Sequence, residues 1–127
     1  MKKVCLTLMF GMFVLALGLS SASALPPFDK EWKAKYLPDS APASLKEAAG
    51  TAKCNVCHEG TSKKMHNVYG KAVKKYLTKA DFDAIKADPD KSKKYIVEGL
   101  EKAEAEKSAG GKSYGELIKE GKAPWEG

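Results

Sequence analysis

The sequence predicts a small all-α domain, and three observations support this. Apolar residues recur at helical spacing along most of the chain, no segment alternates convincingly with the period of two that marks a strand, and a Cys-x-x-Cys-His pentapeptide occupies residues 54–58. The 127 residues contain no internal repeat and no long low-complexity tract, a length that suits one domain. We therefore expect short helices packed around whatever the pentapeptide holds.

The first 24 residues have the pattern of a secretory signal peptide. Lys2 and Lys3 precede an apolar run over 4–19, and the small residues Ala22-Ser23-Ala24 follow as a cleavage site. Cleavage there leaves a mature domain of 103 residues, 25–127. We expect export to the periplasm or an equivalent compartment, with no stable membrane span after processing. An uncleaved signal anchor is the alternative, which mass spectrometry of the mature N-terminus distinguishes.

The first part of the mature chain predicts two short helices. Residues 25–43 are rich in proline and carry Phe28, Trp32 and Tyr36 at four-residue spacing, which predicts a helix over 28–36 with one aromatic stripe. Core packing of that stripe is the expected reading, and packing against a cofactor edge is the sharper alternative. A second helical stretch, 44–52, leads into the pentapeptide.

The rest of the chain predicts a polar turn followed by four helices. Residues 59–64 are polar and suit a turn, after which strong helical periodicity covers 66–77. A short helix with Phe82 and Ile85 should end before Pro89, and Asp90 should cap a long helix over 91–107. A final helix follows Gly110-Gly111. The inward-facing residues expected here are Tyr69, Ala72, Val73, Tyr76, Leu77, Ile96, Leu100, Ala103, Tyr114, Leu117 and Ile118.

The pentapeptide is the pattern that attaches haem c covalently. Cys54 and Cys57 would bind the two vinyl groups as thioethers, and His58 would be the proximal iron ligand. A zinc site made of Cys54, Cys57, His58 and His66 is the rival, but adjacent Cys57 and His58 fit zinc-finger spacing badly. We expect one covalent haem c and a domain that wraps around it.

The ligand on the distal face of the iron follows from a count of strong ligands. After processing, Met65 is the one methionine left, and His66 is the one histidine besides His58. The seven residues from His58 to Met65 can span about 23 Å when extended, enough to pass a haem edge. Distal Met65, or His66 as the alternative, indicates a one-electron carrier, whereas an open face would bind nitric oxide or carbon monoxide.

Lysine supplies the entire positive charge. The chain has 22 lysines and no arginine against 16 acidic residues, and removal of Lys2 and Lys3 leaves a net charge of +4. A lysine cluster follows the pentapeptide and predicts a redox partner that is acidic at the contact. Nucleic acid is not expected as a partner, because no base-stacking aromatic pattern accompanies the lysines. The clustered lysines are Lys63, Lys64, Lys71, Lys74 and Lys75.

No constellation of acid, base and nucleophile accompanies the pentapeptide. A peroxidase would need a distal base, and His66 is the one residue available for that role. The sequence therefore predicts a protein that carries an electron or a gas, and not an enzyme.

Several motifs spread over nearly the whole mature chain form a further pattern: Phe28, Trp32, Tyr36, 53–58, Lys63-Lys64, 67–70 and 113–118. Together they resemble the small monohaem cytochrome c domains of planctomycete-type bacteria. The resemblance implies a cytochrome c-like helical domain of periplasmic type. Similar proteins of anaerobic ammonium oxidisers include dimers that bind nitric oxide with a cysteine on the distal side, so a homo- or heterodimer is compatible with it. This chain departs from those forms because it has no third mature cysteine.

Overall fold

The computed structural model describes residues 26–127, so the expected signal peptide lies outside the described residues. Helices account for 63% of the structure and strands for 9%, so the fold is mostly helical, as expected, but includes a short hairpin that the all-α prediction did not contain. In chain order the elements are α1 Pro26–Tyr36, α2 Ala43–Ala52, the 3-10 helix η1 Lys53–Val56, β1 His58–Glu59, β2 Ser62–His66, α3 Val68–Lys74, α4 Lys79–Ile85, α5 Pro89–Glu104, α6 Tyr114–Lys119 and the 3-10 helix η2 Pro124–Glu126.

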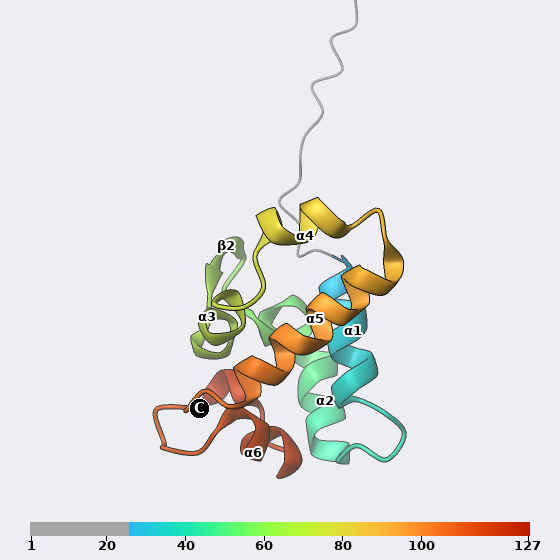
Figure 1. The fold of residues 1–127 in the computed structure, drawn as a ribbon. Coiled ribbons are helices and arrows are strands. Elements are labelled where there is room, and N and C mark those ends of the chain that lie inside the picture. The colour runs from blue at the N-terminus through green and yellow to red at the C-terminus, as the bar shows by residue number, and fades with distance from the viewer. Residues whose placement is uncertain (1–25) are drawn as a thin grey trace, which may run out of the picture.

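Helix α5 is the central element of the domain. It crosses α1 and also contacts α3, α4 and α6, as the orange helix in Figure 1 shows. Its start differs from the expectation, because Asp88 and not Asp90 is the N-cap: the Asp88 carboxylate accepts from the amides of Asp90 and Lys91 at 3.1 Å. Pro89 fits the first helical position, where its missing N–H needs no partner.

The core is formed mainly by residues that the sequence placed inward. Trp32 and Tyr36 of α1 are buried, and Phe28 lies at the edge of the core with its ring 5.1 Å from that of Phe82. The aromatic stripe therefore packs on protein in this structure, as the core-packing interpretation expects. The largest fully buried side chains are Tyr69, Leu45, Ile96 and Pro124.

A short antiparallel hairpin follows the pentapeptide where a polar turn was expected. Strands β1 and β2 pair His58 with His66 and Glu59 with Ser62, and Gly60 has a φ of 63° in the connection. Glycine adopts this left-handed conformation without the strain that a side chain would add. Because β2 extends to His66, helix α3 begins at Val68, two residues later than the periodicity predicts. The hairpin, residues 58–66, therefore turns the chain back onto His58.

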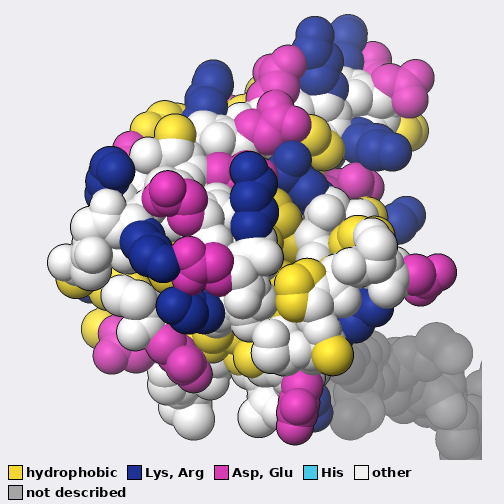
Figure 2. Space-filling view, turned by 90° about the horizontal axis from the view of Figure 1, so that it is seen from below, with side chains coloured by type: hydrophobic (Ala, Val, Ile, Leu, Met, Phe, Trp, Pro, Cys, Tyr) yellow, Lys and Arg dark blue, Asp and Glu magenta, His cyan; other side chains and the backbone are white. Residues whose placement is uncertain are grey.

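No helix within residues 26–127 is long and apolar enough to cross a membrane. Over the face in Figure 2, lysine and carboxylate side chains alternate, in keeping with the many exposed ion pairs of the described chain.

Candidate functional site

The pentapeptide lies on a tight turn between α2 and the hairpin. We call residues 53–58 the attachment turn. Lys53, at the end of α2, has a φ of 52° and is the one non-glycine residue with a positive φ between residues 26 and 127. Such a conformation costs free energy and persists only where the surrounding structure enforces it. The break at Lys53 ends α2 and places Cys54 and Cys57 on one short 3-10 turn.

The two cysteines are free thiols in different surroundings. Cys54 is exposed, whereas Cys57 packs against the edge of the core. Burial, with a smaller contribution from the Asp29 carboxylate, raises the pKa of the Cys57 thiol to about 12. A thiolate is therefore disfavoured at Cys57, while an uncharged thioether has no such desolvation penalty. The environment of Cys57 fits haem attachment better than it fits zinc.

The zinc alternative also requires four ligands to converge. Within the described part of the chain, no group of three or more His, Cys, Asp or Glu side chains lies close enough to hold a metal ion. The four side chains that zinc would need, those of Cys54, Cys57, His58 and His66, are therefore not assembled into such a site.

His58 is held in one tautomer by the hairpin. Its Nδ1 lies 3.2 Å from the carbonyl oxygen of Met65, and a carbonyl can only accept a hydrogen bond. Nδ1 therefore carries the proton, and Nε2 keeps a free lone pair. Iron-ligating histidines use the same arrangement, in which a backbone acceptor fixes the ring and the opposite nitrogen binds the metal. This geometry fits the role of proximal ligand predicted for His58.

The hairpin brings both expected distal residues next to His58. The ring of His66 lies 4.9 Å from that of His58, at an interplanar angle of 39°. Burial lowers the pKa of His66, and the nearby His58, Lys74 and Lys71 lower it further. Met65 faces the other way along the strand and is 56% exposed, while its carbonyl bonds His58. His66 is the cross-strand partner of His58, so the two imidazole rings are neighbours in this structure.

The lysines around the attachment turn lack carboxylate partners. Five lysines near the turn take part in none of the ion pairs within residues 26–127. We call these five residues the lysine face: Lys53, Lys63, Lys64, Lys71 and Lys74. Lys75 was expected in this cluster, but it pairs with Glu106 at 2.6 Å. The exposed apolar side chains of Met65 and Val68, 56% and 42% exposed, lie on the same hairpin and α3 start.

Two residues at the start of α3 contact the attachment turn. The sequence did not predict either of them as a site residue. Asn67 is the N-cap of α3 and hydrogen bonds the turn, and Gly70 lies against Cys57 so closely that an added Cβ would be 1.8 Å from the Cys57 carbonyl oxygen. An asparagine before an amphipathic helix is a recognisable N-cap signal. Its contacts with a segment twelve residues earlier carry no local signal.

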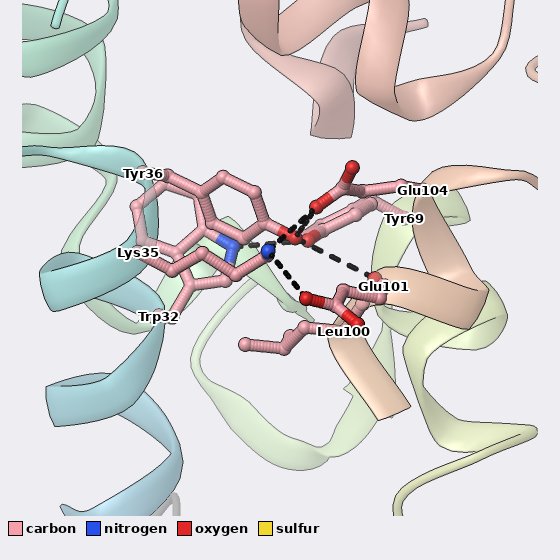
Figure 3. Close-up of polar contacts among 7 residues, drawn as sticks. All are labelled: Trp32, Lys35, Tyr36, Tyr69, Leu100, Glu101 and Glu104. Carbon is pink, nitrogen blue, oxygen red and sulfur yellow. Dashed lines mark hydrogen bonds and ion pairs between the residues drawn. The ribbon is translucent and has the colours of Figure 1, made fainter. Parts of the chain in front are cut away.

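Behind α3, a buried polar network ties the helix to α1 and α5 (Figure 3). The Trp32 indole N–H donates to the Tyr69 hydroxyl at 3.0 Å, and the Tyr36 hydroxyl donates to Glu104 at 2.7 Å. Lys35 lies 3.3 Å from the same Glu104 carboxylate. Burial raises the pKa values of Tyr36 and Tyr69, so both phenols stay protonated. The network fixes the position of the helix that lies on the attachment turn.

Comparison with family models, with curated proteins and with solved structures finds no match to this chain. The resemblance to monohaem cytochrome c domains therefore stays a prediction that is based on the motifs alone.

Proposed function

We propose that the chain is an exported monohaem c-type cytochrome that carries one electron at a time. The observation that carries the proposal is the His58 ring, whose Nδ1 contacts the Met65 carbonyl and leaves Nε2 free, in the same short turn as two free cysteines. This donor set fits a covalently attached haem, because it combines two thiols with one imidazole that a backbone carbonyl orients. The signal peptide pattern supports assembly in the periplasm or an equivalent compartment.

The residues that would hold the group have distinct tasks. The thiols of Cys54 and Cys57 would each add across a vinyl double bond, forming a C–S bond while the thiol hydrogen passes to the neighbouring carbon. No oxidant or reductant is consumed in this addition. His58 would bind iron through Nε2, and the Met65 carbonyl orients the ring as long as the hairpin is closed. When bound, haem supplies the one-electron Fe(III)/Fe(II) couple.

The distal ligand of this proposal is Met65, with His66 as its alternative. In that role, the Met65 or His66 side chain must reach the opposite face of the haem, so the hairpin would open when haem binds and His58 Nδ1 would then give up its Met65 carbonyl partner. The contact between His58 and the Met65 carbonyl also favours a second candidate function. If the hairpin stays closed, Met65 and His66 both stay near His58 and the distal face is free for nitric oxide or carbon monoxide.

Spectra of single variants distinguish the two functions. In protein matured with a haem-attachment system, Met65→Ala is expected to lose the low-spin spectrum and the weak far-red charge-transfer band of methionine ligation. Loss in His66→Ala instead would identify histidine as the ligand. Val68→Ala is the matched control, because Val68 is also exposed and lies three residues from Met65.

Other outcomes of this experiment have defined meanings. Unchanged spectra in both variants, together with a spectral shift of the reduced wild type under carbon monoxide, would replace the electron carrier with the gas-binding protein. Absence of a pyridine haemochrome in the wild type would remove haem from the proposal altogether.

The lysine face suits an anionic redox partner. Its lysines take part in none of the ion pairs within residues 26–127, so their field is neutralised less than that of the paired lysines elsewhere on the described surface. We propose that the partner presents acidic side chains to this face and receives or donates the electron there.

A charge-reversal experiment tests the lysine face. The double variant Lys71→Glu/Lys74→Glu is expected to slow electron transfer to ferricyanide, an anionic probe, by about tenfold at low salt. The difference should shrink as ionic strength rises, because salt screens exposed charges. Lys107→Glu/Lys119→Glu changes the net charge equally with exposed residues outside the lysine face. Equal slowing in both double variants would mean that net charge, and not this face, sets the rate.

A further inference from the structure

Four consecutive carbonyl groups of the attachment turn converge on Asn67. The Asn67 side-chain amide donates to the carbonyl oxygens of Asn55, Val56 and His58, at 2.7, 3.1 and 3.3 Å. The carbonyl between them, that of Cys57, accepts the Asn67 backbone N–H at 3.1 Å. One residue therefore satisfies the main-chain acceptors of the whole segment that includes Cys57 and His58.

The same side chain also begins α3. Asn67 Oδ1 accepts the backbone N–H of Gly70 at 2.8 Å, so the amide donates to the attachment turn and accepts from the helix. Asparagine can do both because its side chain ends in an NH₂ group and a carbonyl. Aspartate would keep the helix cap but would place a second acceptor against three carbonyl oxygens. Alanine would remove both functions.

The attachment turn needs such support because it starts from a strained residue. The φ of 52° at Lys53 is unfavourable for a side chain, and a strained conformation survives only where its neighbours determine it. The convergent hydrogen bonds to Asn67 are the contacts that hold the carbonyls after Lys53 in place. They also act directly on the backbone of His58, whose ring must present Nε2.

We propose that Asn67 is a positioning residue that fixes the attachment turn, and through it Cys57 and His58, in the geometry that haem attachment requires. This inference rests on the proposed function, since it assigns Asn67 a task toward the same group. Asn67 does not touch the group itself. It acts through the carbonyls of residues 55–58 and through the start of α3.

The first test measures haem attachment by mass spectrometry and visible spectra of the full chain matured with a haem-attachment system. Asn67→Asp is expected to lower the doubly attached fraction by about tenfold, because the half-buried contacts to the Val56 and His58 carbonyls and the exposed contact to the Asn55 carbonyl all lose their donor. The haem that does attach should show a shifted reduced spectrum. Thr78→Ala is the matched control: it removes another N-cap, whose hydroxyl accepts the Asp81 amide at 3.2 Å, and should leave attachment and spectrum unchanged.

A second measurement does not depend on haem. Amide hydrogen exchange of the protein as isolated should show the Asn67 amide exchanging about tenfold faster in Asn67→Asp, because the turn that accepts it has moved. The Gly70 amide should stay protected, because the carboxylate still accepts it. In Asn67→Ala both amides should lose protection.

The outcomes separate the inference from the proposed function. Wild-type attachment with an unaltered Asn67→Asp spectrum and unaltered exchange would overturn the positioning role and leave the cytochrome proposal standing. A wild type that takes no haem would sink the cytochrome proposal and the haem-directed task of Asn67 with it. In that case, faster exchange of the Asn67 amide in Asn67→Asp would show that Asn67 has a purely structural role.

Discussion

Replacing Gly70 with alanine is expected to lower the free energy of unfolding by about 3 kcal/mol or more. The new Cβ would lie 1.8 Å from the Cys57 carbonyl oxygen and 2.7 Å from its carbon. These are backbone atoms of the attachment turn, and the Asn67 backbone N–H holds the same carbonyl oxygen at the start of α3, at 3.1 Å. The turn cannot retreat, so α3 must separate from it. Chemical denaturation measures the loss, and mass spectrometry should show reduced covalent attachment.

Gly50→Ala is the matched control for this result. Gly50 lies inside helix α2, and no heavy atom lies within 4 Å of its added Cβ. Alanine there should stabilise the protein by about 0.5–1 kcal/mol, because glycine loses more backbone freedom in a helix. If Gly70→Ala unfolded within about 0.5 kcal/mol of the wild type, α3 would not lie against Cys57 as this structure has it.

Much of the helical fold could be predicted from apolar spacing. The stripe of Trp32 and Tyr36 and the inward residues Ile96 and Leu100 follow the helical period, and the structure buries all four. The hairpin could not be predicted in this way. Strand β2 reads Ser-Lys-Lys-Met-His, which has no alternating apolar face, so its pairing with His58 depends on the Gly60 turn and on contacts beyond local sequence.

The candidate site, like the fold, could be predicted from the sequence only in part. Cys54, Cys57 and His58 are predicted by spacing alone, because their chemistry depends on being neighbours in sequence. The places of Met65 and His66 depend on how residues 59–64 turn, and a count of ligands does not contain that turn. An extended segment could reach past a haem edge, but the hairpin uses its length to return to His58. The contacts of Asn67 could not be predicted from the sequence, because its side chain donates to carbonyl groups that lie up to twelve residues earlier.

Tyr69→Phe is expected to cost about 2 kcal/mol of folding free energy, although it removes one oxygen atom. Tyr69 is fully buried, and its hydroxyl is the acceptor for the Trp32 indole N–H. Without that oxygen the buried N–H has no partner and keeps its desolvation penalty. Tyr114→Phe is the matched control, because this neighbouring phenol makes no recorded hydrogen bond within residues 26–127, and it should change stability by less than about 0.5 kcal/mol.

A double-mutant cycle shows whether the loss of stability arises from the unpartnered Trp32 indole N–H or from another effect of the Tyr69 substitution on α3. Trp32→Phe removes the donor, so adding Tyr69→Phe to it should cost about 1 kcal/mol less than Tyr69→Phe costs alone. Full additivity of the two changes would exclude the hydrogen bond as the cause. Because Tyr69 directly precedes Gly70, loosening this anchor should also expose the attachment turn, and faster exchange of the Gly70 amide in Tyr69→Phe would measure it. The buried network behind α3 would then stabilise the attachment turn through the position of α3.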